Sequence, residues 1–273
     1  MVIRRSLPLI QDSSGEVEVN APSCRRSRGR RPAPARDPGG DAGLAPESWS
    51  AQDVAMDNDV ITVPDADALA TRGAAFVAER ARAAVADHGR FTFAVSGGKT
   101  PWAMFAQLVG DDVPWRAVTI FQVDERVAPE GDPDRNLTSL RRSLGDAPAQ
   151  LVPMPVDQQD LETAADAYAS RLPERFDLVH LGLGPDGHTA SLVPNDPVLE
   201  VTDRLVALTQ PYQGHQRMTL TFPALARADE ILWLVSGADK RDALARLLAH
   251  DRSIPAGRVE ARHSTILTDA AAI

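Results

Sequence analysis

The stretch FTFAVSGGKTPWAMF (residues 91–105) decides the expected fold, because it joins a strand, a glycine turn and the start of a helix. The apolar-rich residues 91–95 are typical of a buried strand, and Ser96-Gly97-Gly98 is typical of a tight turn. A helix is expected to begin at Thr100-Pro101 and to continue over 102–108, since proline suits a first helical turn. The helix dipole and free backbone N–H groups then point at the turn, which predicts an anion-binding site.

Gly98-Lys99-Thr100 also matches the last three residues of the P-loop motif of nucleotide-binding proteins. That motif requires a glycine five residues before its second glycine, so that the backbone can curl around the phosphates. Phe93 occupies this position inside the apolar run. The pattern therefore does not support an ATPase or GTPase, and two interpretations remain: a site for another phosphate, or an ordinary turn without a ligand.

Composition indicates a globular protein without strong affinity for nucleic acids. The chain has 273 residues, 43% of them hydrophobic, and a formal net charge of -9, whereas nucleic-acid binding needs clustered Lys and Arg. A small anionic substrate is still compatible with this charge. The single cysteine, Cys24, excludes an internal disulfide and fits a reducing compartment. No apolar run approaches the ~20 residues needed to span a bilayer, and the short apolar patch after MVIRR does not favour secretion, so a cytoplasmic location is expected.

Two regions are predicted along the chain. Residues 1–55 are rich in Arg, Pro, Gly and Ser without an apolar period, so we expect a disordered extension. Its arginines could contact RNA or an acidic partner, but a solvated extension or a translation start at Met56 is the favoured interpretation. Residues 56–273 are expected to form a single α/β catalytic domain.

Strands and helices are expected to alternate from residue 57 onward, which is typical of an α/β fold with a mostly parallel sheet. The expected strands are 91–95, 117–123, 178–183 and 230–235, and the expected helices are 66–88, 102–108, 161–171 and 240–248. Ligands of such sheets bind at the carboxyl ends of the strands. Four polar clusters follow expected strands: Ser96 to Lys99, Asp124 to Arg126, Gly184 to His188, and Ser236-Gly237 with Lys240. Their coincidence at one edge of the sheet predicts a functional site.

Gly182-x-Gly184-x-x-Gly187 follows a strand and so matches the dinucleotide-binding fingerprint. Pro194 and Pro197 argue against a nicotinamide or flavin enzyme, because they would end the crossover helix that this fold requires. A catalytic corner is the favoured interpretation.

In that interpretation His188 lies exposed at a helix start, with Asp186 orienting it, and Thr189 and Ser191 supply hydroxyls. The alternative is that Asp186 is only a turn residue and His188 only a helix cap. The six histidines show no zinc-binding spacing, and no GxSxG nucleophile elbow is present. Any water activated here would need a free general base.

Four segments together resemble the 6-phosphogluconolactonase family over roughly residues 60–271. They are SGGKTP (96–101), DERVAPEGDPDRN (124–136), GLGPDGHTASLVP (182–194) and RMTLTFPALARADEILWLVSGADKR (217–241). The resemblance implies a Rossmann-like open sheet, mostly parallel and flanked by helices, shared with glucosamine-6-phosphate deaminases. It also implies no obligatory cofactor, in addition to the absence of a metal site expected from the histidine spacing, and hydrolysis of 6-phospho-D-glucono-1,5-lactone in the oxidative pentose phosphate pathway.

The resemblance assigns roles position by position. Ser96, Gly97, Gly98, Lys99 and Thr100 match the sugar-phosphate-binding turn, although many members have Ser in place of Lys99. The second motif matches at Asp124, Glu125, Arg126 and Asn136, and basic positions expected to meet the phosphate or the carboxylate product match at Arg217 and Lys240. Val193 stands where Phe is frequent, in a position expected to pack.

His188 matches the family's general base and is expected to deprotonate the water that attacks C1. Asp186 or Asp124 would orient the base or the sugar hydroxyls. Two rivals stay open: an isomerase or deaminase that uses Asp124 at C1–C2, and a non-catalytic sugar-phosphate sensor. The expected partner is a small sugar phosphate lactone, with no nucleic acid or membrane, and the expected state is a monomer or weak homo-oligomer.

Overall fold

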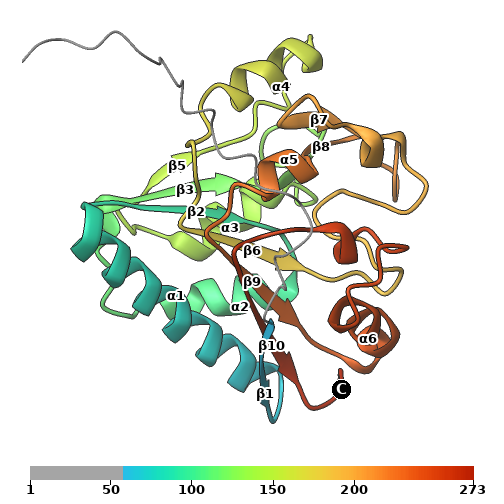
Figure 1. The fold of residues 1–273 in the computed structure, drawn as a ribbon. Helices are drawn as coiled ribbons and strands as arrows, with labels where there is room; N and C mark the ends of the chain where they lie inside the picture. Colours follow the sequence, from blue (N-terminus) through green and yellow to red (C-terminus); the bar gives the residue numbers. More distant parts are fainter. Residues whose placement is uncertain (1–57) are drawn as a thin grey trace, which may run out of the picture. The chain divides into compact units, whose positions relative to one another are not determined.

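Seven parallel strands form the main sheet of residues 58–273, the part of the chain that the computed structural model describes (Figure 1). The prediction for residues 1–55 lies outside the described residues. The strand order is β1 (Asn58–Val63), β10 (His263–Asp269), β9 (Glu230–Val235), β6 (Leu178–Gly182), β2 (Phe91–Val95), β3 (Val118–Gln122) and β5 (Gln150–Val152). Every pairing in this order is parallel, so all seven carboxyl ends lie at one edge.

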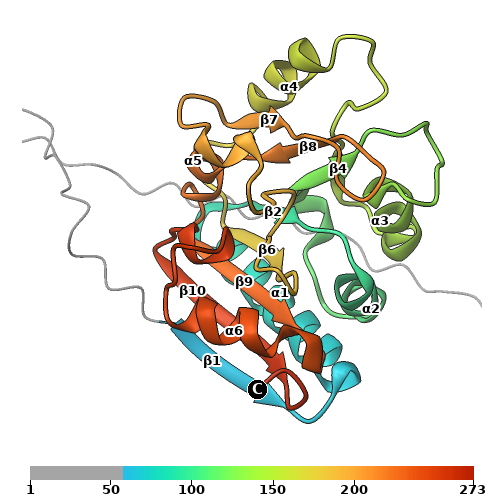
Figure 2. The ribbon, with the colours of Figure 1, turned by 90° about the vertical axis from the view of Figure 1, so that its right-hand side faces the viewer.

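A second, antiparallel sheet lies beside that edge (Figure 2). It consists of β4 (Asp124–Arg126), β8 (Arg217–Leu220) and β7 (Val206–Leu208), in that order. β4 follows β3 after the single residue Val123, so the polar cluster expected at the end of a strand forms a short strand of its own. The register pairs Arg126 with Arg217. This pairing brings together two cationic residues that are far apart in the sequence.

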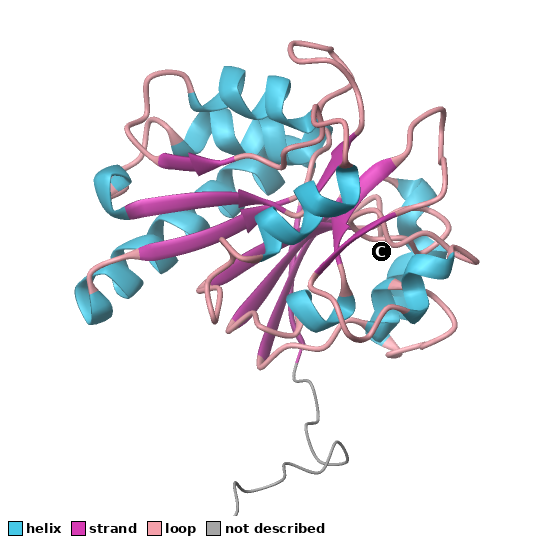
Figure 3. Ribbon diagram, turned by 90° about the horizontal axis from the view of Figure 1, so that it is seen from above, coloured by secondary structure: helices cyan, strands magenta, loops and turns pink. Residues whose placement is uncertain are grey.

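Helices flank both faces of the main sheet (Figure 3). They are α1 (Ala66–His88), α2 (Lys99–Leu108), α3 (Asn136–Leu144), α4 (Leu161–Ala169), α5 (Phe222–Leu225) and α6 (Arg241–Leu248), with short 3-10 turns η1 (Trp115–Ala117), η2 (Pro197–Glu200), η3 (Ala238–Lys240) and η4 (Ala256–Arg258). The Asp65 side chain caps α1 by accepting from the Ala68 N–H, and Gly89 ends it with φ 82°. None of the helices in this part of the chain is long and apolar enough to cross a membrane.

The alternation of side chains along the strands builds two hydrophobic cores. In β2, Phe91, Phe93 and Val95 pack with α1 and α2, whereas Ala94 joins the core on the opposite face. Successive strand residues point to opposite faces, and both faces of a parallel sheet are covered by helices. Strands buried on both faces therefore read as continuous apolar runs, which confirms the expected α/β class with a mostly parallel sheet.

The expected helix after His188 is wrong. Residues 189–192 form a tight turn closed by a bridge between Thr189 and Leu192. Ala190 and Asn195 have φ values of 52° and 67°, a left-handed conformation that interrupts a helix. By contrast, α1, β2 and β9 match their predicted bounds. α2 begins earlier than expected, at Lys99, and η3 precedes α6.

Candidate active site

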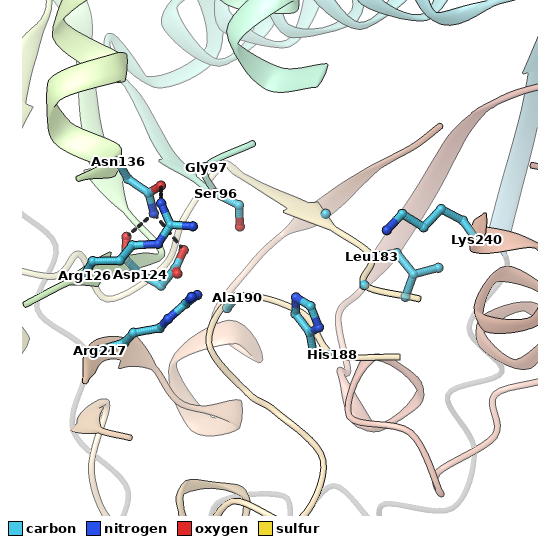
Figure 4. A pocket seen from close by; sticks show the side chains of 12 residues that line it. Ser96, Gly97, Asp124, Arg126, Asn136, Leu183, His188, Ala190, Arg217 and Lys240 are labelled. Carbon is cyan, nitrogen blue, oxygen red and sulfur yellow. Dashed lines mark hydrogen bonds between the residues drawn. The ribbon is translucent and has the colours of Figure 1, made fainter. Parts of the chain in front are cut away.

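A cavity of about 170 Å³ lies at the carboxyl ends of the central strands (Figure 4). Each of the four predicted polar clusters contributes to it. The lining residues are Ser96, Gly97, Asp124, Arg126, Asn136, Gly182, Leu183, Gly184, His188, Ala190, Arg217 and Lys240. The parallel topology explains this convergence, because β2, β3, β6 and β9 all end at this edge.

The turn after β2 presents Ser96 and Gly97 to the cavity. Ser96 is buried, and its Oγ has no hydrogen-bond partner within residues 58–273. A Cβ atom at Gly97 would lie 1.9 Å from Asn136 Oδ1, so only glycine allows the turn to approach Asn136 this closely. The predicted binding residues Gly98, Lys99 and Thr100 do not line the cavity. They form the N-cap and first turn of α2, where the Lys99 side chain is exposed.

Asp124 lies in a buried polar corner of the cavity. Its Oδ2 accepts a hydrogen bond of 2.7 Å from the Ser191 hydroxyl, and its Oδ1 accepts one of 3.3 Å from Asn136 Nδ2. Arg126 donates to Asn136 Oδ1 at 2.9 Å. Arg217, which is 5% exposed, completes the corner, and burial lowers the pKa of its guanidinium although Asp124 opposes the shift. The corner therefore joins two guanidinium groups to one carboxylate.

Glu125 is a structural cap, which corrects its predicted role in substrate binding. The side chain is fully buried and does not line the cavity. Its carboxylate accepts hydrogen bonds from the backbone N–H groups of Asn136, Leu137 and Arg126. The first two belong to the start of α3, where a negative charge complements the helix dipole. The motif therefore alternates side chains that line the cavity, Asp124 and Arg126, with the buried structural side chain of Glu125.

His188, which lines the cavity, forms a close pair with Asp186. His188 Nδ1 lies 2.5 Å from Asp186 Oδ1, which also accepts the His188 backbone N–H at 3.1 Å. Burial raises the pKa of Asp186, but the hydrogen bonds and charge of His188 outweigh this effect and lower it. The ionised carboxylate favours the proton on Nδ1, which leaves Nε2 free to accept a proton. Asp186 does not itself line the cavity and contacts a lining residue through its hydrogen bond with His188.

Gly184 determines where the His188 ring can lie. A Cβ atom at Gly184 would be 2.1 Å from His188 Nδ1 and 2.7 Å from Asp186 Oδ1. We expect Gly184→Ala to displace the ring and to lower kcat by roughly 10- to 100-fold, because small misplacements of a catalytic group are costly. Gly110→Ala is the control, since Gly110 does not line the cavity and its Cβ would meet only the Gln107 carbonyl, at 3.3 Å. Steady-state kinetics should show the kcat loss in Gly184→Ala only, and equal losses would contradict the prediction.

Lys240 reaches the cavity from η3, after β9. Its Nζ lies 3.1 Å from the exposed carboxylate of Asp239. Ser236 and Gly237 of the same cluster do not line the cavity, because they donate to Asp269 at 2.5 and 3.1 Å. Figure 4 shows Lys240 on one side of the cavity, the Asp124 corner on the other, and His188 between them. The site thus has two separate cationic ends.

Some features of the site carry no local sequence signal. Ala190 lines the cavity in its left-handed conformation, and Leu183 adds an apolar wall. His180 is fully buried behind the Ser96 turn, with Nδ1 3.3 Å from the Ser96 backbone nitrogen. Burial lowers the pKa of His180 to about 3, so its ring is neutral.

Across residues 58–273, no group of three or more His, Cys, Asp or Glu side chains is placed to hold a metal ion.

Comparison with known proteins identifies the family to which this chain is similar. Residues 64–268 match the family model described as glucosamine-6-phosphate isomerases/6-phosphogluconolactonase. A 6-phosphogluconolactonase of Synechocystis is 36% identical over 195 residues, which cover 66% of this chain and 81% of the relative. The 6-phosphogluconolactonase of Mycobacterium tuberculosis is 36% identical over 234 residues, which cover 77% of this chain and 95% of the relative.

Solved structures show the same architecture. A 6-phosphogluconolactonase from Shewanella baltica superposes with a TM-score of 0.70 at 27% identity, covering 79% of this chain and 98% of that chain. A monomeric glucosamine-6-phosphate deaminase reaches a TM-score of 0.70 at 17% identity, covering 78% of this chain and 98% of that chain. The second likeness concerns the fold alone. Fold similarity therefore does not separate the two chemistries, and the side chains of the cavity must do so.

Proposed function

The chain belongs to the family of glucosamine-6-phosphate isomerases and 6-phosphogluconolactonases, and on this premise we propose that its cavity hydrolyses 6-phospho-D-glucono-1,5-lactone to 6-phospho-D-gluconate. This reaction is a step of the oxidative pentose phosphate pathway. The curated lactonases described above are covered over 81% and 95% of their length, so the proposal concerns the whole activity and not one part of it.

The observation that carries the proposal is a set of buried donors without protein partners. Within residues 58–273, Ser96 Oγ, Arg126 Nε and Arg217 Nε have no hydrogen-bond partner, and all three residues line the cavity. Buried polar groups are normally paired, so unpaired donors gathered at one cavity favour a ligand rich in acceptors. A sugar phosphate lactone has acceptors at both ends, which suits a cavity with two cationic ends.

We assign the phosphate to the space between Lys240 and the turn formed by Ser96 and Gly97, whose other side packs against Asn136. The α2 N-terminus begins directly after this turn and favours negative charge there. The lactone carbonyl then lies toward the opposite end, where Arg126 and Arg217 can stabilise charge that develops on its oxygen. This orientation uses every cationic group of the cavity and leaves His188 beside the reacting carbon.

His188 begins the reaction by taking a proton from water through Nε2, while Asp186 stabilises the imidazolium. The water oxygen bonds to C1, and the carbonyl electron pair moves onto the oxygen, where the two guanidinium groups stabilise it. When the carbonyl re-forms, the bond from C1 to the ring oxygen breaks. The imidazolium then returns its proton to that oxygen, and the new carboxylic acid releases its proton to solvent.

Asp124 favours hydrolysis over the isomerase or deaminase alternative. Such an enzyme would need Asp124 as a free base at C1–C2. Here the carboxylate accepts hydrogen bonds from Ser191 and Asn136, so both of its oxygens already have protein partners. We therefore assign Asp124 to orienting sugar hydroxyls and Arg217.

The direct test is hydrolysis of freshly prepared 6-phosphogluconolactone, coupled to 6-phosphogluconate dehydrogenase and compared with the spontaneous rate. We expect the protein to accelerate the reaction well above that background. A folded protein that gives no acceleration, but deaminates glucosamine 6-phosphate, would replace this proposal with the isomerase alternative. A protein that binds the sugar phosphate and converts neither substrate would indicate a sensor.

The phosphate assignment predicts that Lys240→Met is selective. A hydrogen bond from a charged group contributes about 1.5–3 kcal/mol, which corresponds to roughly a 10- to 100-fold rise in KM for the phosphorylated lactone. Unphosphorylated glucono-1,5-lactone lacks the group that Lys240 binds, so its kcat/KM should change little. The two substrates are compared in one hydrolysis assay. Equal losses with both would place Lys240 at the reacting carbon instead.

A further inference from the structure

Tyr212, which does not line the cavity, lies at the tip of the hairpin that joins β7 to β8. The turn residues Gln213 and Gly214 have φ values of 51° and 86°, the conformation of the tight turns that suit hairpins. Tyr212 and His215 exchange both backbone hydrogen bonds, at 2.9 and 3.3 Å. The tip is therefore an ordered extension of the small sheet.

A side-chain contact ties this tip to the other wall of the site. His215 Nε2 lies 3.2 Å from Asp134 Oδ2. The Asp134 carbonyl in turn accepts a hydrogen bond of 2.7 Å from Arg126, which lines the cavity. Tyr212 is thus held from both sides, by the hairpin ladder and by this contact.

The Tyr212 ring contacts two residues that line the cavity, His188 and Arg217, at the same time. Its centroid is 5.6 Å from that of His188, with the rings inclined by 68°, an edge-to-face geometry. The guanidinium carbon of Arg217 lies 5.2 Å from the centroid of the same ring, within cation–π range. Arg217 Nη2 also donates to the Tyr212 carbonyl at 3.4 Å. One aromatic ring therefore separates the imidazole from the guanidinium.

The aromatic ring of Tyr212 contributes more than its hydroxyl to the contacts with the cavity residues. Tyr212 Oη lies 3.5 Å from Asp186 Oδ2, at the outer limit for a hydrogen bond. Burial and the charge of Asp186 raise the pKa of the phenol, so it stays protonated. A weak hydroxyl contact and two ring contacts imply that an aromatic side chain without the hydroxyl would still serve.

We propose that Tyr212 is a positioning residue whose ring keeps the His188 imidazole and the Arg217 guanidinium apart and correctly oriented. The inference rests on the proposed function. Without the ring, the long Arg217 side chain would be free to swing toward Asp186 and His188. The base and the group that stabilises the oxyanion would then both leave their positions, although neither residue had been altered.

Two substitutions test the proposal. Tyr212→Phe keeps the ring, and we expect its kcat and KM to stay within about threefold of wild type. Tyr212→Leu removes the ring, and we expect kcat/KM to fall roughly 10- to 100-fold, mainly through kcat. Gln210→Ala, an exposed side chain on the same hairpin, is the control. Thermal unfolding of all variants checks that the fold is retained.

A second readout does not depend on the reaction. The 15N chemical shifts of the His188 ring nitrogens can be measured by NMR with 15N-labelled histidine. We expect the same shifts in wild type and Tyr212→Phe. In Tyr212→Leu we expect shifts closer to those of a histidine ring that moves freely in solvent. Full activity and unchanged His188 signals in Tyr212→Leu would overturn the proposal. A wild-type protein without lactonase activity would overturn the proposed function instead, and the NMR comparison would still decide the role of Tyr212.

Discussion

Replacing His188 by alanine is expected to lower kcat by about 10²- to 10⁴-fold, the usual contribution of a general base, while KM changes little. His188 lines the cavity and is held by Asp186 with Nε2 available for a proton, so the substitution removes proton transfer and leaves the phosphate site intact. The lactone is intrinsically reactive, so each rate must be corrected for spontaneous hydrolysis. Saturation kinetics with the coupled assay separate kcat from KM.

His88 provides the matched control. Its Nε2 lies 2.9 Å from Asp177 Oδ1, so it too is a histidine paired with an aspartate, although its side chain is 38% exposed against 22% for His188. Asp177 also accepts from the backbone and hydroxyl of Thr92, near the beginning of β2 and therefore at the edge of the sheet away from the cavity. We expect His88→Ala to retain wild-type kcat. Near-normal kcat in His188→Ala would disprove the role of His188 as the base.

The comparison of the two histidines illustrates what local sequence can predict. Apolar runs and glycine turns located β2, β6 and β9, and the parallel topology then required their carboxyl ends to meet. His188 was identified because it follows one of these ends, whereas His88 ends a helix. Position relative to a strand end is what distinguishes the histidine that lines the cavity, because the residue types are the same.

The small antiparallel sheet could not be predicted in this way. β4 is only three residues long, and its partner β8 comes much later in the chain, so nothing local indicates that Arg126 faces Arg217. Tyr212 was missed for the same reason, since its role depends on a hairpin whose position is fixed by long-range pairing. Such contacts depend on which distant segments pack together, and local patterns in a single sequence do not indicate these pairings.

Glu125 shows a different limit. The resemblance matches Asp124, Glu125 and Arg126 to one motif of the site, but side chains alternate along a strand, so the middle residue points away from its neighbours. Asp124 and Arg126 line the cavity, while Glu125 enters the interior beneath α3. Recognising Asp124–Arg126 as a strand would have been enough to separate the three roles.

The buried position makes Glu125→Ala the substitution with the largest expected effect on stability. It removes an acceptor shared by the N–H groups of Asn136 and Leu137 and by Gln122 Nε2, and it takes away the ion-pair partner of Arg135, at 3.6 Å. Breaking a buried pair on one side costs about 3–5 kcal/mol in the free energy of unfolding. Urea denaturation of the full chain measures this loss.

Glu130→Ala is the control that separates the effect of burial on stability from the effect of losing a negative charge. Glu130 pairs with Arg141 at 3.0 Å, but its side chain is 70% exposed, and a surface ion pair contributes about 0–1 kcal/mol. The two variants remove the same side chain from the same region, so only burial and hydrogen bonding distinguish them. If Glu125→Ala unfolded like wild type yet bound the lactone weakly, Glu125 would be a ligand-binding residue after all. A large loss of stability in Glu125→Ala alone would establish that its carboxylate holds the start of α3, and with it Asn136, against the cavity.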